Sequence, residues 1–403
     1  MSEFIKLIKI IYTLLFIPIY LIIKIFSPFI FLRWSQLQTA RVGGLTMETY
    51  IYYNYRQSKI KNNIKLIDIF YPEKIISNKF LFNLSKKKLI IFPRNLMIPL
   101  EKIDLFFCKF FPFFRSHRFN LTDIRFKNRH LINENKKFLS LKSSQILNKG
   151  NRILQKLGIP INKKYVCLIV RDDEYLEKKF PKFNWKYHEY RNSDIEKFIP
   201  AIKKLTSKGI YVLRMGSKTK KKLDLNDDLF IDYSNSDQQS DFMDVFLFSS
   251  CYFTITTGTG IDTISYVSNK PMVYIGLVPL KGFQYSGRKI ISLTKDHYDE
   301  KKSKLMTLKE IFKCGIWKAD KSQSFKEKFI TLKENKPSDI LDAVNEMIEK
   351  LENKWKPTDE INKLQIKFKE TFSKNIKHLF EDDFKITSDY SSNYLIKNKW
   401  WLE

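Results

Sequence analysis

The first 33 residues are the most apolar part of the chain. Pro18 lies in the middle of this segment and predicts a break in any helix that it forms. The longest uncharged stretch, Ile10–Ile23, has 14 residues, fewer than the roughly 20 that a membrane-spanning helix needs. On a helical wheel the polar residues share one face. These residues are Lys6, Lys9, Thr13, Tyr20 and Lys24.

This single polar stripe predicts a helix that lies in a membrane interface, with its lysines toward anionic head groups. An uncleaved signal anchor is the competing interpretation, because lysines can snorkel from a tilted span. A cleavable signal peptide is disfavoured, because no small-x-small site follows the apolar run. We therefore expect residues 1–33 to form a membrane-interface anchor.

Beyond residue 160, short apolar runs alternate with helical patterns. Five runs have the length of buried strands, and they cover residues 165–170, 210–216, 229–234, 252–258 and 271–276. One predicted helix runs through Ile195–Leu205 with Ser193 as its N-cap, and another covers Asp241–Phe248. Strands that alternate with helices form parallel sheets with right-handed crossovers. The pattern predicts a Rossmann-like α/β domain.

In the first half of the chain, short apolar runs also alternate with helical patterns, although their boundaries are less distinct. This alternation predicts a second Rossmann-like domain. The fold class is therefore α/β, with two such domains behind an N-terminal membrane-interface helix. The expected ranges are 1–33 for the anchor, 34–155 for the first domain, 156–337 for the second, and 338–403 for C-terminal helices that pack across both domains.

Polar and small residues follow the predicted strands at one edge of the second domain's sheet. They are Arg171, Arg214, Gly216, Asp232, Asp244, Thr257, Gly258, Thr259 and Gly260. Ligands of doubly wound sheets bind outside the carboxyl ends of the strands. A glycine and hydroxyl turn lets backbone N–H groups and a helix dipole approach a phosphate, and two arginines suit a pyrophosphate. Each feature alone is more often a plain turn or a surface ion pair, but their convergence favours an anion site.

The segment YHEYRNSDI is a second dense group of polar residues. His188 and Glu189 are candidates for a general base. Arg191 and Asn192 are candidates for holding substrate hydroxyls or phosphate. The alternative is a polar loop that ends in a helix cap at Ser193.

The chain is strongly basic, with 72 Lys and Arg against 43 Asp and Glu and a formal net charge of +29. Such a charge attracts nucleic acid, anionic lipid or a phosphate-bearing substrate. The alternative explanation is the lysine-rich composition of an AT-rich genome, which leaves most lysines solvated. Specific nucleic-acid binding is disfavoured, because no recognition motif is present and the basic residues are spread along the chain.

The sequence contains no motif that predicts a metal site. The four cysteines are far apart and include no C-x-x-C pair, so zinc spacing is absent. There is also no D-x-D carboxylate pair of the kind that holds a Mg²⁺–nucleotide. We therefore expect no catalytic metal and no cofactor.

Several segments resemble a family of bacterial glycosyltransferases encoded at surface-polysaccharide loci. In order along the chain they are RVGGL followed by Glu48, VCLIVRDDEYL, HEYRNSDI, GIYVLRMG, IDYSNSDQQSDFMDVFLFSSCYFTITTGTGID and ITSDYSSNYLIKNKWW. The matches run from about Arg41 to the C-terminus. The arginine after the first strand and the Gly/Thr turn after the fourth are also similar to the donor pocket of fucosyltransferase-like GT-B enzymes.

The resemblance implies a GT-B-like fold and a metal-independent glycosyltransferase for a hexosyl or related sugar. Its donor would be a nucleotide-sugar, with a GDP-sugar as one candidate, and its acceptor a growing surface glycan or a polyprenyl-linked glycan. It implies a peripheral or monotopic protein at the cytoplasmic face of the inner membrane, where its anchor contacts an anionic surface.

The family's R-x-G-H-L loop, expected to contact the acceptor, reads here Arg41, Val42, Gly43, Gly44 and Leu45. The missing histidine moves the expected base to His188, Glu189 or Glu48. Arg191 and Asn192 are also expected to contact the acceptor. Two rival functions stay open at this point: a basic nucleic-acid-binding protein, and a catalytically inactive membrane scaffold of the same fold.

Overall fold

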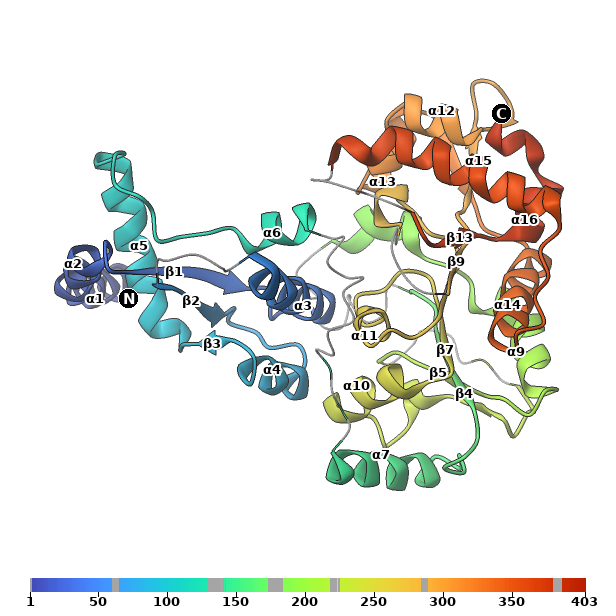
Figure 1. Cartoon of the computed structure of the whole chain (residues 1–403), viewed down its shortest axis with the longest axis horizontal. Helices are drawn as coiled ribbons and strands as arrows, with labels where there is room; N and C mark the ends of the chain where they lie inside the picture. The colour runs from blue at the N-terminus through green and yellow to red at the C-terminus, as the bar shows by residue number, and fades with distance from the viewer. Residues whose placement is uncertain are drawn as a thin grey trace. The chain divides into compact units, whose positions relative to one another are not determined.

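The computed structural model describes residues 2–59, 65–128, 139, 141, 143–172, 184–217, 223, 225–283, 289–379 and 386–403. The chain divides into two compact units, Met1–Phe138 and Leu139–Glu403 (Figure 1). Each unit contains its own parallel sheet flanked by helices. This confirms the expected α/β class with parallel sheets.

Unit 1 holds a three-stranded parallel sheet in the order β1-β2-β3. Its strands are β1 (Ile30–Leu37), β2 (Lys65–Pro72) and β3 (Ile90–Ile91), and its helices are α1 (Ser2–Leu14), α2 (Ile17–Phe26), α3 (Val42–Lys59), α4 (Lys79–Lys86), α5 (Arg94–Phe110) and α6 (Leu121–Lys127). The long pair β1–β2 keeps one register from Ile30 opposite Lys65 to Leu37 opposite Pro72. A helix follows each of the first two strands, as parallel pairing requires.

The apolar N-terminus is helical and exposed. Glu3–Phe26 is long and apolar enough to cross a membrane by length and composition, with a mean hydropathy of 2.1 and only 6% of it buried. The helix breaks at Leu15 and Phe16, and Pro18 occupies the first turn of α2. A proline is tolerated there because the first helical N–H groups have no intrahelical partner. The break expected from Pro18 is therefore present.

The polar stripe of this segment faces protein over its second half. Tyr20 is fully buried, and its hydroxyl donates to Asp104 of α5 at 2.8 Å. The Lys24 ammonium donates to the carbonyl of Arg115 at 2.7 Å and lies 3.8 Å from Asp104. The expectation that all the lysines point toward lipid head groups is thus wrong for Lys24, because its ammonium is bound by the carbonyl of Arg115 and lies beside the carboxylate of Asp104.

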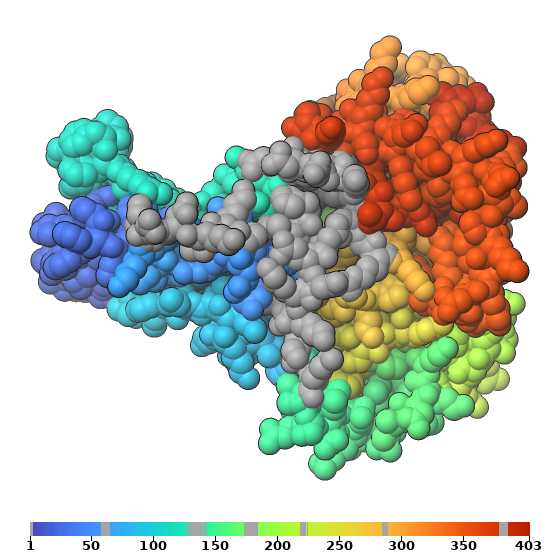
Figure 2. Space-filling model, in the orientation of Figure 1, coloured from blue at the N-terminus to red at the C-terminus, as the bar shows by residue number. Residues whose placement is uncertain are grey.

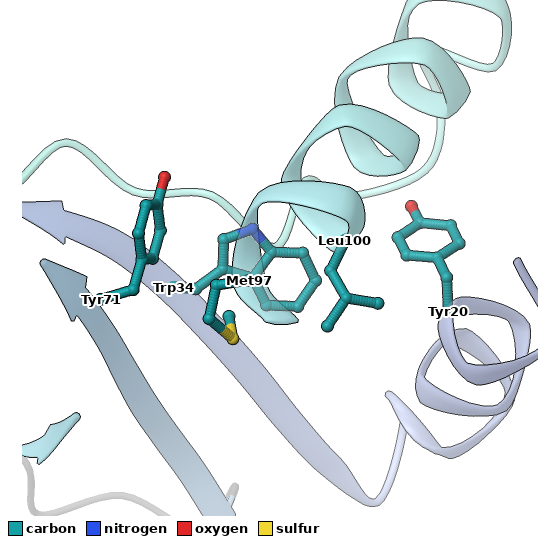
Figure 3. Packing of buried hydrophobic residues seen from close by; sticks show 5 residues of the cluster. All are labelled: Tyr20, Trp34, Tyr71, Met97 and Leu100. Atoms are coloured by element: carbon teal, nitrogen blue, oxygen red, sulfur yellow. The ribbon is translucent and has the colours of Figure 1, made fainter. Parts of the chain in front are cut away.

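The core of unit 1 is rich in aromatic side chains. Figure 3 shows Tyr20 of α2, Trp34 of β1 and Tyr71 of β2 packed with Met97 and Leu100 of α5. The N-terminal helices are therefore part of this core and not a separate tether.

A buried carboxylate joins the two long strands of unit 1 to the helix between them. Asp68 of β2 accepts two hydrogen bonds from Arg33 of β1, at 2.8 and 3.0 Å. It also accepts from Tyr52 and, at 3.3 Å, from Arg56, both on α3. A paired guanidinium and several hydrogen bonds offset the desolvation of this charge.

Unit 2 is built on a seven-stranded sheet in the order β13-β9-β8-β7-β4-β5-β6, and every neighbouring pair is parallel. The strands are β4 (Tyr165–Ile169), β5 (Tyr211–Arg214), β6 (Phe230–Ile231), β7 (Phe253–Thr256), β8 (Met272–Tyr274), β9 (Ile290–Ser292) and β13 (Asp389–Tyr390). From β6 to β9 the strands follow the order of a Rossmann sheet. All five predicted strands are present, each shorter than its apolar run.

Helices cover both faces of this sheet (Figure 1). Helices α9 (Ile199–Thr206) and α14 (Pro337–Leu351) pack together on one face, and α10 (Asp241–Ser250) and α11 (Thr263–Val267) lie on the other. Helix α7 (Ser144–Lys156) packs against α10. It therefore belongs to unit 2, whereas the sequence analysis assigned it to the first domain.

The C-terminal part of unit 2 contains elements that the apolar pattern did not predict. A small antiparallel sheet consists of β10 (Asp296–Asp299), β11 (Lys304–Leu305) and β12 (Ile330–Lys333). Helices α12 (Leu308–Lys313), α13 (Ser322–Glu327), α15 (Asp359–Ile376) and α16 (Ser392–Lys397) complete the unit. Glu346 of α14 accepts two hydrogen bonds from Ser392 of α16, at 2.8 and 2.9 Å. These bonds join α16 to α14, one of the helices that cover the seven-stranded sheet.

The contact of α7 with α10 requires a residue without a side chain. A Cβ atom placed on Gly150 would lie 2.2 Å from the ring of Phe246. We expect Gly150→Ala to destabilise the protein by about 1–2 kcal/mol, because overpacking outweighs the gain in helix propensity. Thermal unfolding followed by circular dichroism measures this. The double variant Gly150→Ala/Phe246→Leu should recover part of the loss, and a Gly150→Ala variant with a raised melting temperature would contradict the prediction.

Candidate functional site

The loops after β4 and β7 meet at the point where the strand order of unit 2 reverses. The backbone N–H of Arg171, after β4, donates to the Thr257 hydroxyl at 2.8 Å. The backbone N–H of Thr257, after β7, donates to the carbonyl of Ile169 at 3.2 Å. The two loops therefore form one structure at the place where Rossmann sheets bind their ligands.

The turn after β7 is held by a buried carboxylate. Asp262 accepts from the Thr256 hydroxyl at 2.6 Å and from the Thr259 N–H at 2.9 Å. Gly258 has a φ of +79°, a backbone conformation that glycine adopts without strain. The Thr259 hydroxyl is buried and makes no hydrogen bond within the described residues. The helix that follows, α11, has only five residues, so its dipole adds little, contrary to expectation.

Arg191 and Asn192 lie at the end of the 3₁₀ helix η2 (Trp185–Arg191). The Arg191 guanidinium donates to the carbonyl of Gly258. The carbonyl of Asn192 accepts from the ammonium of Lys295, which is 4% exposed. The structure thus brings Arg191 of the YHEYRNSDI segment to the glycine–threonine turn, whereas Asn192 contacts Lys295.

Ser193 has a different role from the one predicted. Its backbone N–H donates to the carbonyl of Arg171 at 3.2 Å. The helix cap is Asp194, whose carboxylate accepts from the Glu196 N–H at 3.1 Å. Both residues can cap a helix, and the sequence alone does not separate two adjacent candidates. The prediction of Ser193 as the N-cap was therefore wrong by one residue.

Arg214 ends β5 and is 4% exposed. Its Nη1 atom lies 3.6 Å from the carboxylate of Asp232, beyond hydrogen-bonding distance, and makes no hydrogen bond within the described residues. Burial lowers the pKa of Arg214, and the charges of Asp232 and Asp172 partly offset this. A guanidinium nevertheless stays protonated. The site therefore holds a buried positive charge that the described residues only partly compensate.

The other predicted residues of this edge hold the loops. The carbonyl of Gly216 accepts from the Gln239 side chain. Asp244 accepts from the Tyr233 hydroxyl at 3.0 Å, and burial raises the pKa of Asp244 to about 6. Gly260 is exposed at the end of the turn. Asp244 is therefore a supporting group beneath the surface.

The two candidate bases of this segment differ in exposure. Glu189 is exposed on η2. His188 is half-buried, and its ring centroid lies 3.9 Å from that of Tyr187 and 6.5 Å from that of Trp185. Glu189 is the better placed of the two to contact a substrate, because its carboxylate is accessible.

The predicted acceptor loop of unit 1 lies between β1 and α3. Arg41 is exposed, and Gly43 and Gly44 lie in the first turn of α3. A Cβ atom on Gly44 would lie 2.7 Å from the Gln38 side chain, so this glycine is required for the tight turn. The sequence offered the glycine as a ligand-binding feature, and the structure gives it a packing role.

Glu48 is completely buried. Its carboxylate accepts from the Gln38 N–H at 3.2 Å and from the Thr122 hydroxyl at 3.0 Å, and Arg125 lies 3.8 Å away. Burial raises the pKa of Glu48, and Arg125 and the two hydrogen bonds oppose the rise. A base must contact the hydroxyl that it deprotonates. The surroundings of Glu48 therefore support a structural role beneath the loop.

Two features lie away from these residues. A surface depression of about 540 Å³ runs along α7, lined by Gln145, Asn148, Lys149, Arg152, Ile153 and Lys156. All of them belong to one helix, so the depression brings no chemistry together. Within the described parts of the chain, no three His, Cys, Asp or Glu side chains gather as a metal site.

Comparisons with known proteins return only remote likenesses. No family model matches the chain, and neither does any curated protein. Among solved structures, the ADP-heptose LPS heptosyltransferase II of E. coli is 11% identical, with a TM-score of 0.40 over 65% of this chain and 90% of that one. A family 9 glycosyl transferase from Veillonella parvula is 9% identical, with a TM-score of 0.41 over 66% and 86%. These scores are too low to support an argument, so the fold rests on the sheet topology.

Asp262 provides a pH-dependent test of the turn. Burial raises its pKa from 3.8 to about 6. At a pH between these two pKa values, the carboxyl group of Asp262 is protonated in the folded protein and ionised in the unfolded chain. The carboxyl group therefore stabilises the fold most below pH 3.8 and loses that contribution as the pH rises through about 6.

Asp262→Asn keeps an acceptor for Thr256 and Thr259 but cannot ionise. We therefore expect its free energy of unfolding, relative to that of the wild type, to increase as the pH rises through this range, by on the order of 3 kcal/mol in total. Melting curves of both proteins between acid and neutral pH measure the difference. A difference that does not change with pH would show that Asp262 is not the buried acid described.

Proposed function

We propose that this protein is a glycosyltransferase that transfers a sugar from a nucleotide-sugar to a surface glycan or lipid-linked acceptor. The observation that carries the proposal is the meeting of the loop after β4 with the glycine–threonine turn after β7, where the order of a Rossmann sheet reverses. The resemblance of these segments to bacterial glycosyltransferases of surface-polysaccharide loci supports it, as does a two-unit α/β architecture of the GT-B kind.

The donor would lie with its diphosphate at the turn of unit 2. The backbone N–H of Gly260 and the buried hydroxyl of Thr259 suit phosphate oxygens, because glycine leaves the backbone accessible and the hydroxyl makes no hydrogen bond within the described residues. The N–H groups of Gly258 and Thr259 shape the turn instead, since they donate to the Thr256 hydroxyl at 3.0 Å and to Asp262 at 2.9 Å. Arg171 follows β4 and Arg214 ends the neighbouring strand β5, and both supply positive charge. The partly uncompensated charge of Arg214 favours an anion at this place.

Sugar transfer forms a bond between the acceptor oxygen and the anomeric carbon and breaks the bond between that carbon and the diphosphate. The negative charge on the departing diphosphate grows as the bond breaks, so arginines aimed at it bind the transition state more tightly than the donor. Glu189 or His188 would accept the proton of the acceptor hydroxyl. Arg41 and the turn at Gly43 and Gly44 would contact the acceptor on unit 1.

The membrane-facing N-terminus fits an acceptor carried by a polyprenyl lipid at the cytoplasmic face of the inner membrane. The protein would be peripheral or monotopic there. A GDP-sugar is one candidate donor, and thermal-shift screening against UDP-, GDP-, CMP- and dTDP-sugars identifies the nucleotide.

Removing either donor-site arginine should reduce turnover as well as binding. We expect Arg171→Ala and Arg214→Ala each to lower kcat/KM. The expected loss of transition-state stabilisation is on the order of 2–4 kcal/mol for each variant. Arg152→Ala is the matched control, because Arg152 is exposed on α7 of the same unit. Binding of the donor identified by screening, its turnover and a melting curve are measured for each variant.

Unchanged binding and turnover in folded Arg171 and Arg214 variants would place the donor elsewhere. Salt-sensitive DNA binding without nucleotide-sugar binding would favour a nucleic-acid-binding protein. Donor binding without transfer or hydrolysis would favour an inactive scaffold.

We expect transfer activity to be independent of divalent metal, because the sequence lacks the D-x-D pair that holds a metal–nucleotide complex. Activity measured with EDTA should equal activity measured with added Mg²⁺ or Mn²⁺. Loss of activity in EDTA and its recovery with either ion would contradict the prediction.

A further inference from the structure

Exposed apolar side chains are concentrated in unit 1. Among the described residues of unit 2, few large hydrophobic side chains are exposed, namely Leu147, Ile161, Tyr187, Phe329 and Ile366. In unit 1 they crowd two places. One is the α1–α2 segment, and the other is the C-terminal end of α5 with the residues that follow it. Contiguous exposed apolar surface of this kind marks a binding surface.

The second place, which we call the phenylalanine tip, comprises Phe106, Phe110, Phe111, Phe113 and Phe114. Phe113 is 77% exposed and Phe106 is 66% exposed. The rings pack on one another, with 4.6 Å between the centroids of Phe106 and Phe110 and between those of Phe113 and Phe114. Each ring therefore keeps an outer face in water, which is unfavourable unless another phase covers it.

The tip is continuous with the N-terminal helices. The Tyr20 ring of α2 lies 5.6 Å from that of Phe107, in the last turns of α5. The Lys24 ammonium lies 5.8 Å from the Phe107 ring and 5.9 Å from the Phe114 ring. The carboxylate of Asp104 accepts a hydrogen bond from the Tyr20 hydroxyl and another, at 2.7 Å, from the hydroxyl of Ser116 in the segment after the tip. Figure 2 shows both apolar places at the same end of unit 1, in dark blue and teal.

The direction of the polar groups explains why the apolar faces point outward. Tyr20 and Lys24 turn inward to Asp104, and Tyr12 donates to the carbonyl of Asn95 at 3.3 Å. The second half of the polar stripe, Tyr20 and Lys24, thus contacts α5, whereas Lys6 and Lys9 in its first half are exposed. The opposite, apolar face remains for the surroundings.

The charge around the tip is positive. Lys102 and Lys109 on α5 and Arg115 after the tip are exposed, and Lys109 lies over the ring of Phe110 at 6.0 Å. Exposed aromatic side chains flanked by cations match the interface of an anionic bilayer, in which rings enter the acyl region and cations stay at the head groups.

We propose that the phenylalanine tip is a second membrane-insertion element, and that it forms one lipid-binding surface with the N-terminal helices. The occupant is an anionic phospholipid bilayer. Two insertion points hold unit 1 at a set depth and orientation, which a single N-terminal anchor cannot do. The proposal does not depend on sugar transfer.

The test uses the full-length protein with Phe106→Trp or Phe113→Trp. Both side chains are exposed, so neither exchange disturbs the core. Each variant is mixed with vesicles of phosphatidylcholine and phosphatidylglycerol whose acyl chains carry bromine. The fluorescence added by the new tryptophan is obtained by subtracting the wild type. Ile366→Trp is the matched control, because Ile366 is an exposed apolar residue on α15 of unit 2.

We expect brominated lipid to quench the added fluorescence at positions 106 and 113 by at least about twofold and to leave that at position 366 unchanged. Equal responses at all three positions would overturn the proposal. The same variants without vesicles test a second copy of the chain as the occupant. An emission shift at positions 106 and 113 that grows with protein concentration would assign the tip to self-association and would also overturn the proposal.

Discussion

One hydrogen bond, from the backbone N–H of Arg171 to the hydroxyl of Thr257, joins the two loops on which the candidate donor site depends. It crosses the point where the strand order reverses, and there the chain leaves β4 and β7 toward opposite faces of the sheet. Asp262 holds the second loop from below through Thr256 and Thr259. A neutral threonine and a buried acid thus shape the backbone of this turn.

The electrostatics of the site depend on its buried charged groups. Asp262 and Asp244, both in unit 2, are acids whose pKa values are raised by burial. Both hold the surrounding backbone and side chains by accepting hydrogen bonds. Within the described residues, the Nη1 atom of Arg214 makes no hydrogen bond and lies 3.6 Å from the carboxylate of Asp232. Arg191 is bound to the scaffold, because it donates to the carbonyl of Gly258. A buried guanidinium such as that of Arg214 favours an anion nearby.

The sequence predicted the central strands of unit 2, because continuous apolar runs of strand length are distinctive when helices separate them. It did not predict β9, β13 or the antiparallel sheet, because strands of two to four residues outside longer apolar runs carry little periodic signal. It found the polar stripe of the N-terminus but not its partner, since a helical wheel says which residues share a face and not what that face contacts. Asp262 was missed because its role depends on a turn that folds back, set by the positive φ of Gly258.

Strand β1 separates the exposed apolar end of unit 1 from its predicted acceptor loop. It begins at Ile30, directly after the N-terminal helices, and ends at Leu37, just before Arg41 (Figure 1). Eight residues of strand span about 25 Å. The strand is a fixed spacer, because it is hydrogen-bonded to β2 along its whole length. For the proposed transferase, an acceptor whose lipid stays in the bilayer would have to extend by a comparable length to reach Arg41, and a lipid-linked oligosaccharide would do so more readily than a bare lipid phosphate.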